Sequence, residues 1–296
     1  MYYNDKTIVY LDGEWIKAKD ANLSFFSQTF HYGIGVFEGI RSYETPVGPS
    51  VFKAVEHYER LIMSAESMQI PFKYKVDELV HITYELLKKN KLQNAYIRPL
   101  VFMGENMGLT TRKENHLIMA AWEWDRFLGN SLVKVMISSY QRPNPKSCHV
   151  EAKVIGHYTN SVLATNEAKS KGYNEALLLD ANGYVAEGPG ANFFYEKDGV
   201  LFTPPEGNIL PGITRATVME LAKDMGVEVR EEYFDTEVLK DIDSAFFVGT
   251  AAEVAGIQSI DGNKMNLKWE DSIGYNLHWA YMRRVTEKEI TDFSLV

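Results

Sequence analysis

The chain has 296 residues, and its 31 Lys and Arg residues against 40 Asp and Glu residues give a formal charge of −9. Hydrophobic residues make up 45% of the chain, which is typical of a folded protein rather than a disordered one. The acidic balance, with no Lys- or Arg-rich block, argues against DNA or RNA as the main partner. At roughly 150 residues per domain, the length predicts two domains.

The cysteine content and the apolar runs bear on the location of the protein. The single cysteine, Cys148, leaves no intrachain disulfide and no Cys-rich zinc site. No apolar run approaches the roughly 20 residues that span a bilayer, and the first residues lack the pattern of a signal peptide. We therefore expect a soluble, cytoplasmic protein with no membrane partner.

The first half of the chain mixes strand and helix patterns. Turn residues between apolar runs predict a hairpin near the start, and helical spacing of apolar residues predicts two amphipathic helices. The expected strands are 7–11, 14–16, 36–43, 95–103 and 116–122. The expected helices are 54–68 and 76–90. This half is therefore predicted to be α+β.

Periodicity breaks over 124–131 and resumes at Val133. We therefore expect a first domain at 1–124, an interdomain linker at 125–132 and a second domain at 133–296. The second domain is expected to hold helices near 160–171 and 214–226. Its expected strands are 133–137, 175–180, 183–186, 191–195 and 244–248.

Several common catalytic motifs are absent from the sequence. It contains no GxxxxGK[ST], GxSxG or HExxH pattern. Gly33-Ile34-Gly35 lacks the third glycine of a dinucleotide fingerprint. The seven histidines show no metal-ligand pairing with carboxylates on one helix face, so we expect no metal site.

Three glycine-rich turns in the second half suggest anion binding. They lie at 187–192, 210–215 and 249–253, and the second of them opens a helix. The amides of Ile213 and Thr214 would then offer N–H groups to an anion. Each turn taken singly is also explained as an ordinary turn or helix cap. Their occurrence together favours a shared pocket.

Lys153 lies among small and apolar neighbours in the segment 150–156. A lysine held in such surroundings loses hydration, which lowers its pKa and frees the amine for Schiff-base chemistry. A surface lysine whose stem covers apolar neighbours is the alternative interpretation.

Six ordered motifs resemble those of the fold-type IV pyridoxal-phosphate enzymes, and most closely the branched-chain amino-acid aminotransferases. The resemblance covers roughly residues 9–261. The motifs are His31-Tyr32-Gly33 with 36–41, Tyr96-Ile97-Arg98-Pro99-Leu100, Ala152-Lys153, Glu187-Gly188-x-Gly190-x-Asn192-x-Phe194, 210–215 and 249–253. The resemblance implies an α+β, two-domain, D-amino-acid aminotransferase-like architecture with the active site in the interdomain cleft.

The resemblance also implies a pyridoxal 5′-phosphate cofactor and the residues that hold it. Lys153 matches the lysine that bonds to the cofactor and later moves a proton between the substrate Cα and the cofactor C4′. Glu187 matches the carboxylate at the pyridine nitrogen, which makes the ring a better electron sink. Tyr158 matches the tyrosine at the phenolic oxygen. The positions that match the phosphate contacts are Arg60, Ile213, Thr214 and Thr250.

Tyr96 and Arg98 match a pair associated with the substrate α-carboxylate. Alternate residues of a strand share a face, so both side chains can point into one pocket. The positions that match or neighbour the rest of the substrate site are Tyr32, Phe37, Gly39, Met107, Leu109, Trp124 and Ala251. Any of the apolar ones is also explained as plain core. Leu109, at a position where valine is common, and the bulky residues Val154, Ile155 and His157 leave the side-chain preference open.

The implied reaction transfers the amino group of leucine, isoleucine or valine to 2-oxoglutarate, giving a branched 2-oxo acid and glutamate. The partners are small amino and 2-oxo acids and further copies of the chain, in a homodimer or a higher homo-oligomer. A D-amino-acid or (R)-amine aminotransferase is the main alternative, and an aminodeoxychorismate lyase is a second one. The presence of Lys153, Glu187 and Arg60 disfavours a non-enzymatic scaffold, and Tyr96 with Arg98 favours the branched-chain type.

Overall fold

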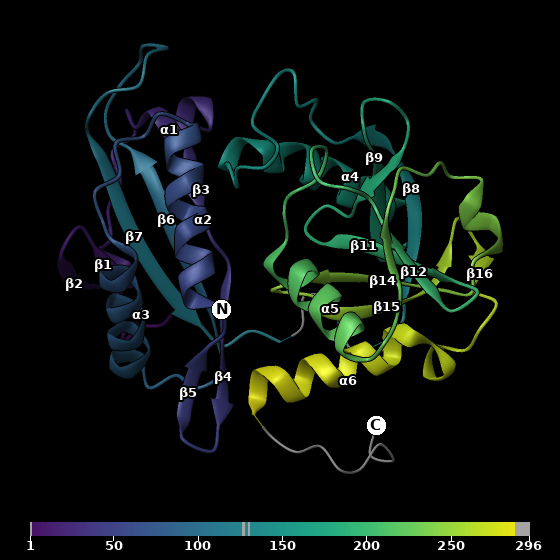
Figure 1. Ribbon diagram of the computed structural model, residues 1–296. Coiled ribbons are helices and arrows are strands. Elements are labelled where there is room, and N and C mark those ends of the chain that lie inside the picture. The colour runs from purple at the N-terminus through teal and green to yellow at the C-terminus, as the bar shows by residue number, and fades with distance from the viewer. Residues whose placement is uncertain (1, 126–127, 130, 288–296) are drawn as a thin grey trace. The chain divides into compact units, whose positions relative to one another are not determined.

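A computed structural model describes residues 2–125, 128–129 and 131–287 of the chain (Figure 1). The chain divides into two compact units. Unit 1 comprises Met1–Asp125 with Ala152–His157, and unit 2 comprises Arg126–Glu151 with Tyr158–Val296. Of the linker expected at 125–132, Arg126, Phe127 and Asn130 lie outside the described residues. None of the helices that the structure describes is long and apolar enough to cross a membrane.

Unit 1 contains a seven-stranded antiparallel sheet with helices α2 and α3 packed against it (Figure 1). The strand order is β2-β1-β7-β6-β4-β5, and β3 pairs with β6 as well. The strands are β1 (Ile8–Leu11), β2 (Glu14–Lys17), β3 (Gly35–Phe37), β4 (Ile40–Thr45), β5 (Gly48–Val51), β6 (Ala95–Met103) and β7 (Asn115–Trp122). The helices are α1 (Gln28–Tyr32), α2 (Ala54–Ser67) and α3 (Val76–Asn90), with short 3-10 turns η1 (Ala18–Asp20) and η2 (Ile155–His157).

The two long helices of unit 1 confirm the prediction made from their apolar spacing. In α3, Leu79 and Leu86 are completely buried and lie two turns apart on one face. Leu61 and Ala65 form the corresponding face of α2. Burying each large side chain contributes about 1.5–3 kcal/mol, so these faces fix both helices on the sheet.

The prediction of a single strand over 36–43 is wrong, because the strand is interrupted at Glu38 and Gly39. β3 and β4 pair with β6 in one register, with Phe37 opposite Leu100 and Ile40 opposite Ile97. The N–H of Glu38 donates to the Pro99 carbonyl at 3.0 Å. Pro99 has no N–H to return the second hydrogen bond of this pair, so the ladder breaks here.

The segment Ala152–His157 belongs to unit 1, although its place in the sequence falls within the second domain predicted at 133–296. Val154 forms an isolated antiparallel bridge with Val36. The Gly156 N–H donates to the Gly33 carbonyl at 3.2 Å. Gly33 has a φ of +68°, and a Cβ on it would lie 2.9 Å from the Gly156 Cα, so this contact requires glycine.

Unit 2 is built on a nine-stranded mixed sheet in the order β10-β9-β8-β15-β14-β11-β12-β13, with β16 paired to β15. Helix α4 packs on β8 and β9, and α5 and α6 pack on β14 (Figure 1). The strands are β8 (Val133–Gln141), β9 (Glu175–Leu179), β10 (Val185–Glu187), β11 (Asn192–Lys197), β12 (Val200–Thr203), β13 (Val229–Glu231), β14 (Ser244–Gly249), β15 (Glu253–Ile260) and β16 (Asn263–Lys264). The helices are α4 (Tyr158–Ser170), α5 (Ile213–Asp224) and α6 (Ile273–Thr286), with 3-10 turns η3 (Val238–Asp241) and η4 (Trp269–Asp271).

Candidate active site

Two hydrogen bonds of its backbone hold Lys153 in unit 1. Its N–H donates to the Ser64 hydroxyl oxygen at 3.0 Å, and its carbonyl accepts the Phe37 N–H at 3.1 Å. The flanking Ala152 and Val154 are buried. The side chain is half-buried, and its Nζ lies 5.0 Å from the centre of the Phe37 ring. An amine whose backbone is held on both sides, beside an aromatic ring, is suited to covalent catalysis.

A buried ionic cluster lies in the same unit. The carboxylate of Glu38 is fully buried and accepts hydrogen bonds from Arg60 Nε at 2.6 Å and Arg60 Nη2 at 2.9 Å. His57 Nδ1 lies 2.7 Å from the same carboxylate. Burial opposes ionisation of Glu38, but Arg60 and His57 outweigh it and hold the pKa of this carboxyl well below its usual range. Arg60 is thus held in place by a carboxylate.

Tyr96 and Arg98, two positions apart on β6, are brought together by the structure. Arg98 Nη2 donates to the Tyr96 hydroxyl oxygen at 3.1 Å, and the guanidinium lies 4.6 Å from the centre of the Phe37 ring. The buried Nε of Arg98 has no hydrogen-bond partner among the described residues. A Cβ on Gly39 would lie 2.0 Å from the Tyr96 hydroxyl oxygen, so glycine is required beside the tyrosine. Trp124 meets the Tyr96 ring edge-on at 4.8 Å.

Whereas Tyr96 and Phe37 are buried, Tyr32, Met107 and Leu109 are exposed. Their exposed fractions are 44%, 53% and 86%, and the Tyr32 hydroxyl donates to the Met107 carbonyl at 3.0 Å. Nearby aromatic residues are equally open, with Phe25 at 73% and Phe30 at 64% exposure. Within unit 1 these predicted substrate contacts form a surface rather than a pocket wall.

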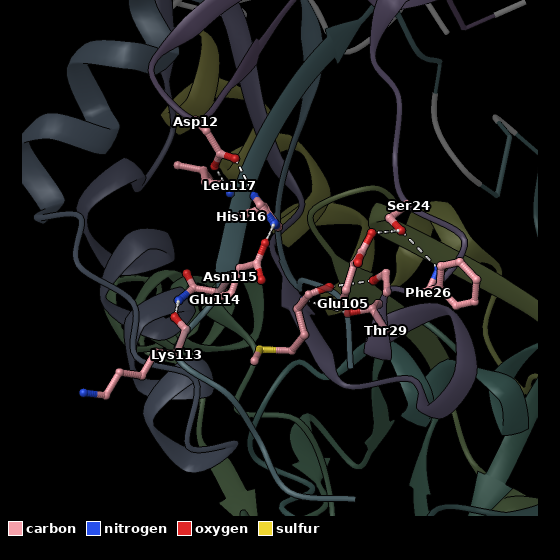
Figure 2. A network of polar contacts seen from close by, with 12 residues as sticks. Asp12, Ser24, Phe26, Thr29, Glu105, Lys113, Glu114, Asn115, His116 and Leu117 are labelled. Carbon is pink, nitrogen blue, oxygen red and sulfur yellow. Dashed lines mark hydrogen bonds and ion pairs between the residues drawn. The ribbon is translucent and has the colours of Figure 1, made fainter. Parts of the chain in front are cut away.

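The β6–β7 loop that carries Met107 and Leu109 is fastened at both ends (Figure 2). At the first end, the Ser24 hydroxyl donates to Glu105 Oε1 at 2.6 Å. At the second end, His116 Nδ1 lies 2.6 Å from Asp12 Oδ2, and its Nε2 lies 3.6 Å from Glu114. These contacts hold the loop in place while its apolar tip stays exposed.

In unit 2, three groups hold the carboxylate of Glu187. Arg142 Nε lies 2.9 Å from Oε1, which also accepts the Leu210 N–H at 3.1 Å. The amide of Asn192 donates to Oε2 at 2.9 Å. Glu187 is 5% exposed and Arg142 is 8% exposed. An ionised partner and two neutral donors favour the charged carboxylate, which suits it to face a protonated ring nitrogen.

The three glycine-rich turns meet at one end of the sheet of unit 2. Glu187 pairs with Asn192, and Asn192 pairs with Val248 at the end of β14. A Cβ on Gly249 would lie 3.2 Å from the Gly190 carbonyl oxygen, which places the third turn beside the first. Thr250 and Ala251 lie in the short link from β14 to β15.

Helix α5 begins at Ile213, and its N-cap residue Gly212 provides no side-chain cap. Its first turn has no acidic residue and contains the buried Thr214. A helix start of this kind attracts an anion through its N–H groups and its dipole. The last predicted cofactor residue, Tyr158, is the first residue of α4 and is half-buried.

Sequence reasoning did not assign a role to four residues of these networks. Glu38 and Asn192 stand inside quoted motifs, while His57 and Arg142 do not. His57 had one available signal, because it lies three residues before Arg60 on a helix and therefore on the same face. Arg142 had none, since its contact with Glu187 joins distant parts of the chain.

The amino-transferase class IV family model matches residues 35–260, and the chain belongs to this family. A branched-chain-amino-acid aminotransferase of Pseudomonas aeruginosa is 40% identical over 287 residues, which are 95% of this chain and 94% of the relative. The crystal structure of the Escherichia coli branched-chain amino acid aminotransferase superposes with a TM-score of 0.92 at 37% identity, covering 98% of each chain.

A T.th. branched-chain amino acid aminotransferase, solved in complex with N-(5′-phosphopyridoxyl)-L-glutamate, superposes with a TM-score of 0.90. It is 35% identical, and the match covers 95% of each chain. The fold class expected from the motifs, an α+β fold-type IV aminotransferase, is confirmed.

Proposed function

We propose that this protein is a branched-chain-amino-acid aminotransferase, which transfers the amino group of leucine, isoleucine or valine to 2-oxoglutarate. The observation that carries the proposal is the match of 95% of the chain, at 40% identity, to a relative of that name. The products are a branched 2-oxo acid and L-glutamate.

The residues fit pyridoxal 5′-phosphate as the cofactor. The ligand needs an amine for its aldehyde, an anion for its ring nitrogen and donors for its phosphate. Lys153 provides the amine, and Glu187 is a buried carboxylate that forms an ion pair with Arg142. The uncapped start of α5 provides phosphate donors. When bound, this cofactor supplies an electron sink for the negative charge that develops at the substrate Cα.

Each residue has a separate task in the proposed reaction. Lys153 would bond to the cofactor through its amine and, once the substrate amine has displaced it, would move a proton between the substrate Cα and the cofactor C4′. Glu187 would hold the proton on the ring nitrogen, and Tyr158 would hydrogen-bond to the phenolic oxygen. The phosphate would be bound by four residues, namely Arg60, Ile213, Thr214 and Thr250.

We assign Tyr96 and Arg98 to the α-carboxylate of the substrate. Support comes from the buried Arg98 Nε without a partner, because an anion is the group such a donor needs. The remaining contacts enclose the apolar side chain and are Tyr32, Phe37, Gly39, Met107, Leu109, Trp124 and Ala251. The exposure of Tyr32, Met107 and Leu109 supports a homodimer in which a second copy meets this surface.

The substrate class is tested by the glutamate formed from 2-oxoglutarate with L-leucine, D-alanine or (R)-1-phenylethylamine as donor. We expect L-leucine to be the best donor, and the mass of the active species in solution to be at least that of a dimer. A preference for D-alanine or the amine would replace the proposal by a D-amino-acid or (R)-amine aminotransferase. If none of the three donors gives glutamate, the aminodeoxychorismate lyase, which needs no amino acceptor, becomes the favoured alternative.

Arg98→Met is expected to lower kcat/KM for L-leucine far more than kcat/KM for 3-methylbutylamine, which is leucine without its carboxylate. Losing a charge-assisted hydrogen bond costs about 1.5–3 kcal/mol, or roughly ten- to a hundredfold in kcat/KM. Both donors are measured on the same variant, so a general loss of stability affects them equally.

The same variant separates the two carboxylates of glutamate. A loss shared by L-leucine and L-glutamate places Arg98 at the α-carboxylate. A loss confined to L-glutamate moves Arg98 to the side-chain carboxylate, and equal losses with the amine remove it from any carboxylate site.

A further inference from the structure

Asn192 is a buried amide whose donor group serves two different segments of unit 2. Its side chain is 4% exposed, and Nδ2 donates to Glu187 Oε2 at 2.9 Å and to the Leu210 carbonyl at 3.0 Å. The Leu210 N–H in turn donates to Glu187 Oε1 at 3.1 Å. The three hydrogen bonds close a ring through Glu187, Asn192 and Leu210. The carboxylate and the turn that precedes α5 are therefore held together.

The acceptor side of the same amide lies against the N-cap of α5. A Cβ on Gly212 would stand 1.9 Å from the Asn192 Oδ1. Gly212 has a φ of −76°, which any residue adopts, so glycine is needed here for space rather than for conformation. The amide thus contacts the turn at its Leu210 end and at its Gly212 end.

We propose that Asn192 is a positioning residue that sets the place of the α5 N-terminus relative to the Glu187 carboxylate. The inference rests on the proposed function, in which the cofactor's ring nitrogen meets Glu187 and its phosphate meets Ile213 and Thr214. The planar ring and the short phosphate arm of the cofactor limit the distance between these two groups to a narrow range. Pre-setting that distance lowers the ordering cost of binding.

The chemistry of the amide suits this task better than a charged group would. A neutral donor restrains Glu187 without cancelling its negative charge, while Arg142 provides the charge that favours ionisation. An aspartate has nearly the same shape but no donor. It would set its own carboxylate against Glu187 Oε2 and the Leu210 carbonyl, where all groups are acceptors.

The test compares the full-length wild type, Asn192→Ala and Asn192→Asp, each freed of cofactor. The dissociation constant of pyridoxal 5′-phosphate is measured, together with those of pyridoxal and of inorganic phosphate. We expect the dissociation constant of pyridoxal 5′-phosphate to rise about tenfold or more in both variants, and to rise further in Asn192→Asp than in Asn192→Ala. Pyridoxal and phosphate should each lose affinity, because Asn192 supports both ends.

A spectroscopic readout separates positioning from packing. The 15N shift of the ring nitrogen in bound, labelled cofactor should move toward the deprotonated form in both variants, because Glu187 is no longer fixed. If Asn192→Asp keeps the wild-type affinity and shift, the residue only fills space and the proposal is overturned. A wild type that binds no pyridoxal 5′-phosphate would overturn the proposed function, and this inference with it.

Gly212→Ala provides an independent variant that leaves Asn192 in the chain. The added Cβ displaces the amide oxygen, so we expect a similar loss of pyridoxal 5′-phosphate affinity. In the Asn192→Ala background, Gly212→Ala should lower the affinity for pyridoxal 5′-phosphate little further, since Oδ1 is gone. The next atom that the added Cβ meets is Arg215 Cβ, at 3.1 Å. If the two losses of affinity multiply in the double variant, the two residues act independently and the proposed contact between them is overturned.

Discussion

Lys153→Ala is expected to lower the transamination of L-leucine by more than about 10⁴-fold, because one change removes both the nucleophile and the proton carrier. Borohydride treatment of the wild-type protein with bound cofactor should leave the label on the peptide that contains Lys153. A labelled peptide with a different lysine would contradict the assignment.

We expect this variant to fold. The two backbone hydrogen bonds of residue 153, to Ser64 and Phe37, do not involve its side chain. The half-buried side chain leaves little core volume behind on truncation. Lys146→Ala is the matched control, since Lys146 is exposed and close in sequence, and it should keep wild-type activity. Equal losses in both variants would indicate instability rather than catalysis.

The long helices α2 and α3 were predictable from the sequence, and the short helix α1 was not. The apolar faces of α2 and α3 repeat over several turns, whereas α1 has five residues and too few positions for a period to show. Helix α6 was missed although it had a signal. Leu277, Tyr281 and Val285 recur every four residues, and Ser272 caps the start by accepting the Tyr275 N–H.

Other features depend on partners that are distant in sequence. The break between β3 and β4 follows from a proline on β6, and no pattern within 36–43 contains that information. The assignment of Ala152–His157 to unit 1 likewise depends on contacts with Val36 and Gly33. Apolar periodicity depends only on the residues of one segment. It therefore predicts helices and strands better than it predicts which segments pack against them.

In the candidate site, too, residues in local motifs were predictable and their distant partners were not. Motifs pointed to Lys153 and Glu187, because a lysine among small residues and an acid in a glycine-rich turn are local patterns. The groups that orient them are not local. Arg142 reaches Glu187, and Glu38 reaches Arg60, through packing of separate strands and helices.

The buried cluster around Glu38 provides the largest stability effect that we expect in unit 1. Glu38→Gln should destabilise the cofactor-free protein by about 3–5 kcal/mol, because it leaves the Arg60 charge buried without its anion. Chemical denaturation measures the change. Glu56→Gln on the same helix as Arg60 is the control, and it should change stability by less than about 0.5 kcal/mol because its ion pair with Lys53 is partly exposed.

The pH dependence of this difference tests its ionic origin. Arg60 and His57 hold the pKa of Glu38 below its unfolded value, so the folded protein binds its proton less readily than the unfolded chain does. The stabilisation is therefore complete above the unfolded pKa, near pH 4.3, and is lost as the pH falls toward the folded pKa. The gap in unfolding free energy between wild type and Glu38→Gln should accordingly be constant from about pH 6 to 8 and narrow below about pH 4. If the difference in unfolding free energy between wild type and Glu38→Gln is the same in acid, the substitution disturbs packing rather than charge. The ion pair between Arg60 and Glu38 would then not be the source of the stabilisation.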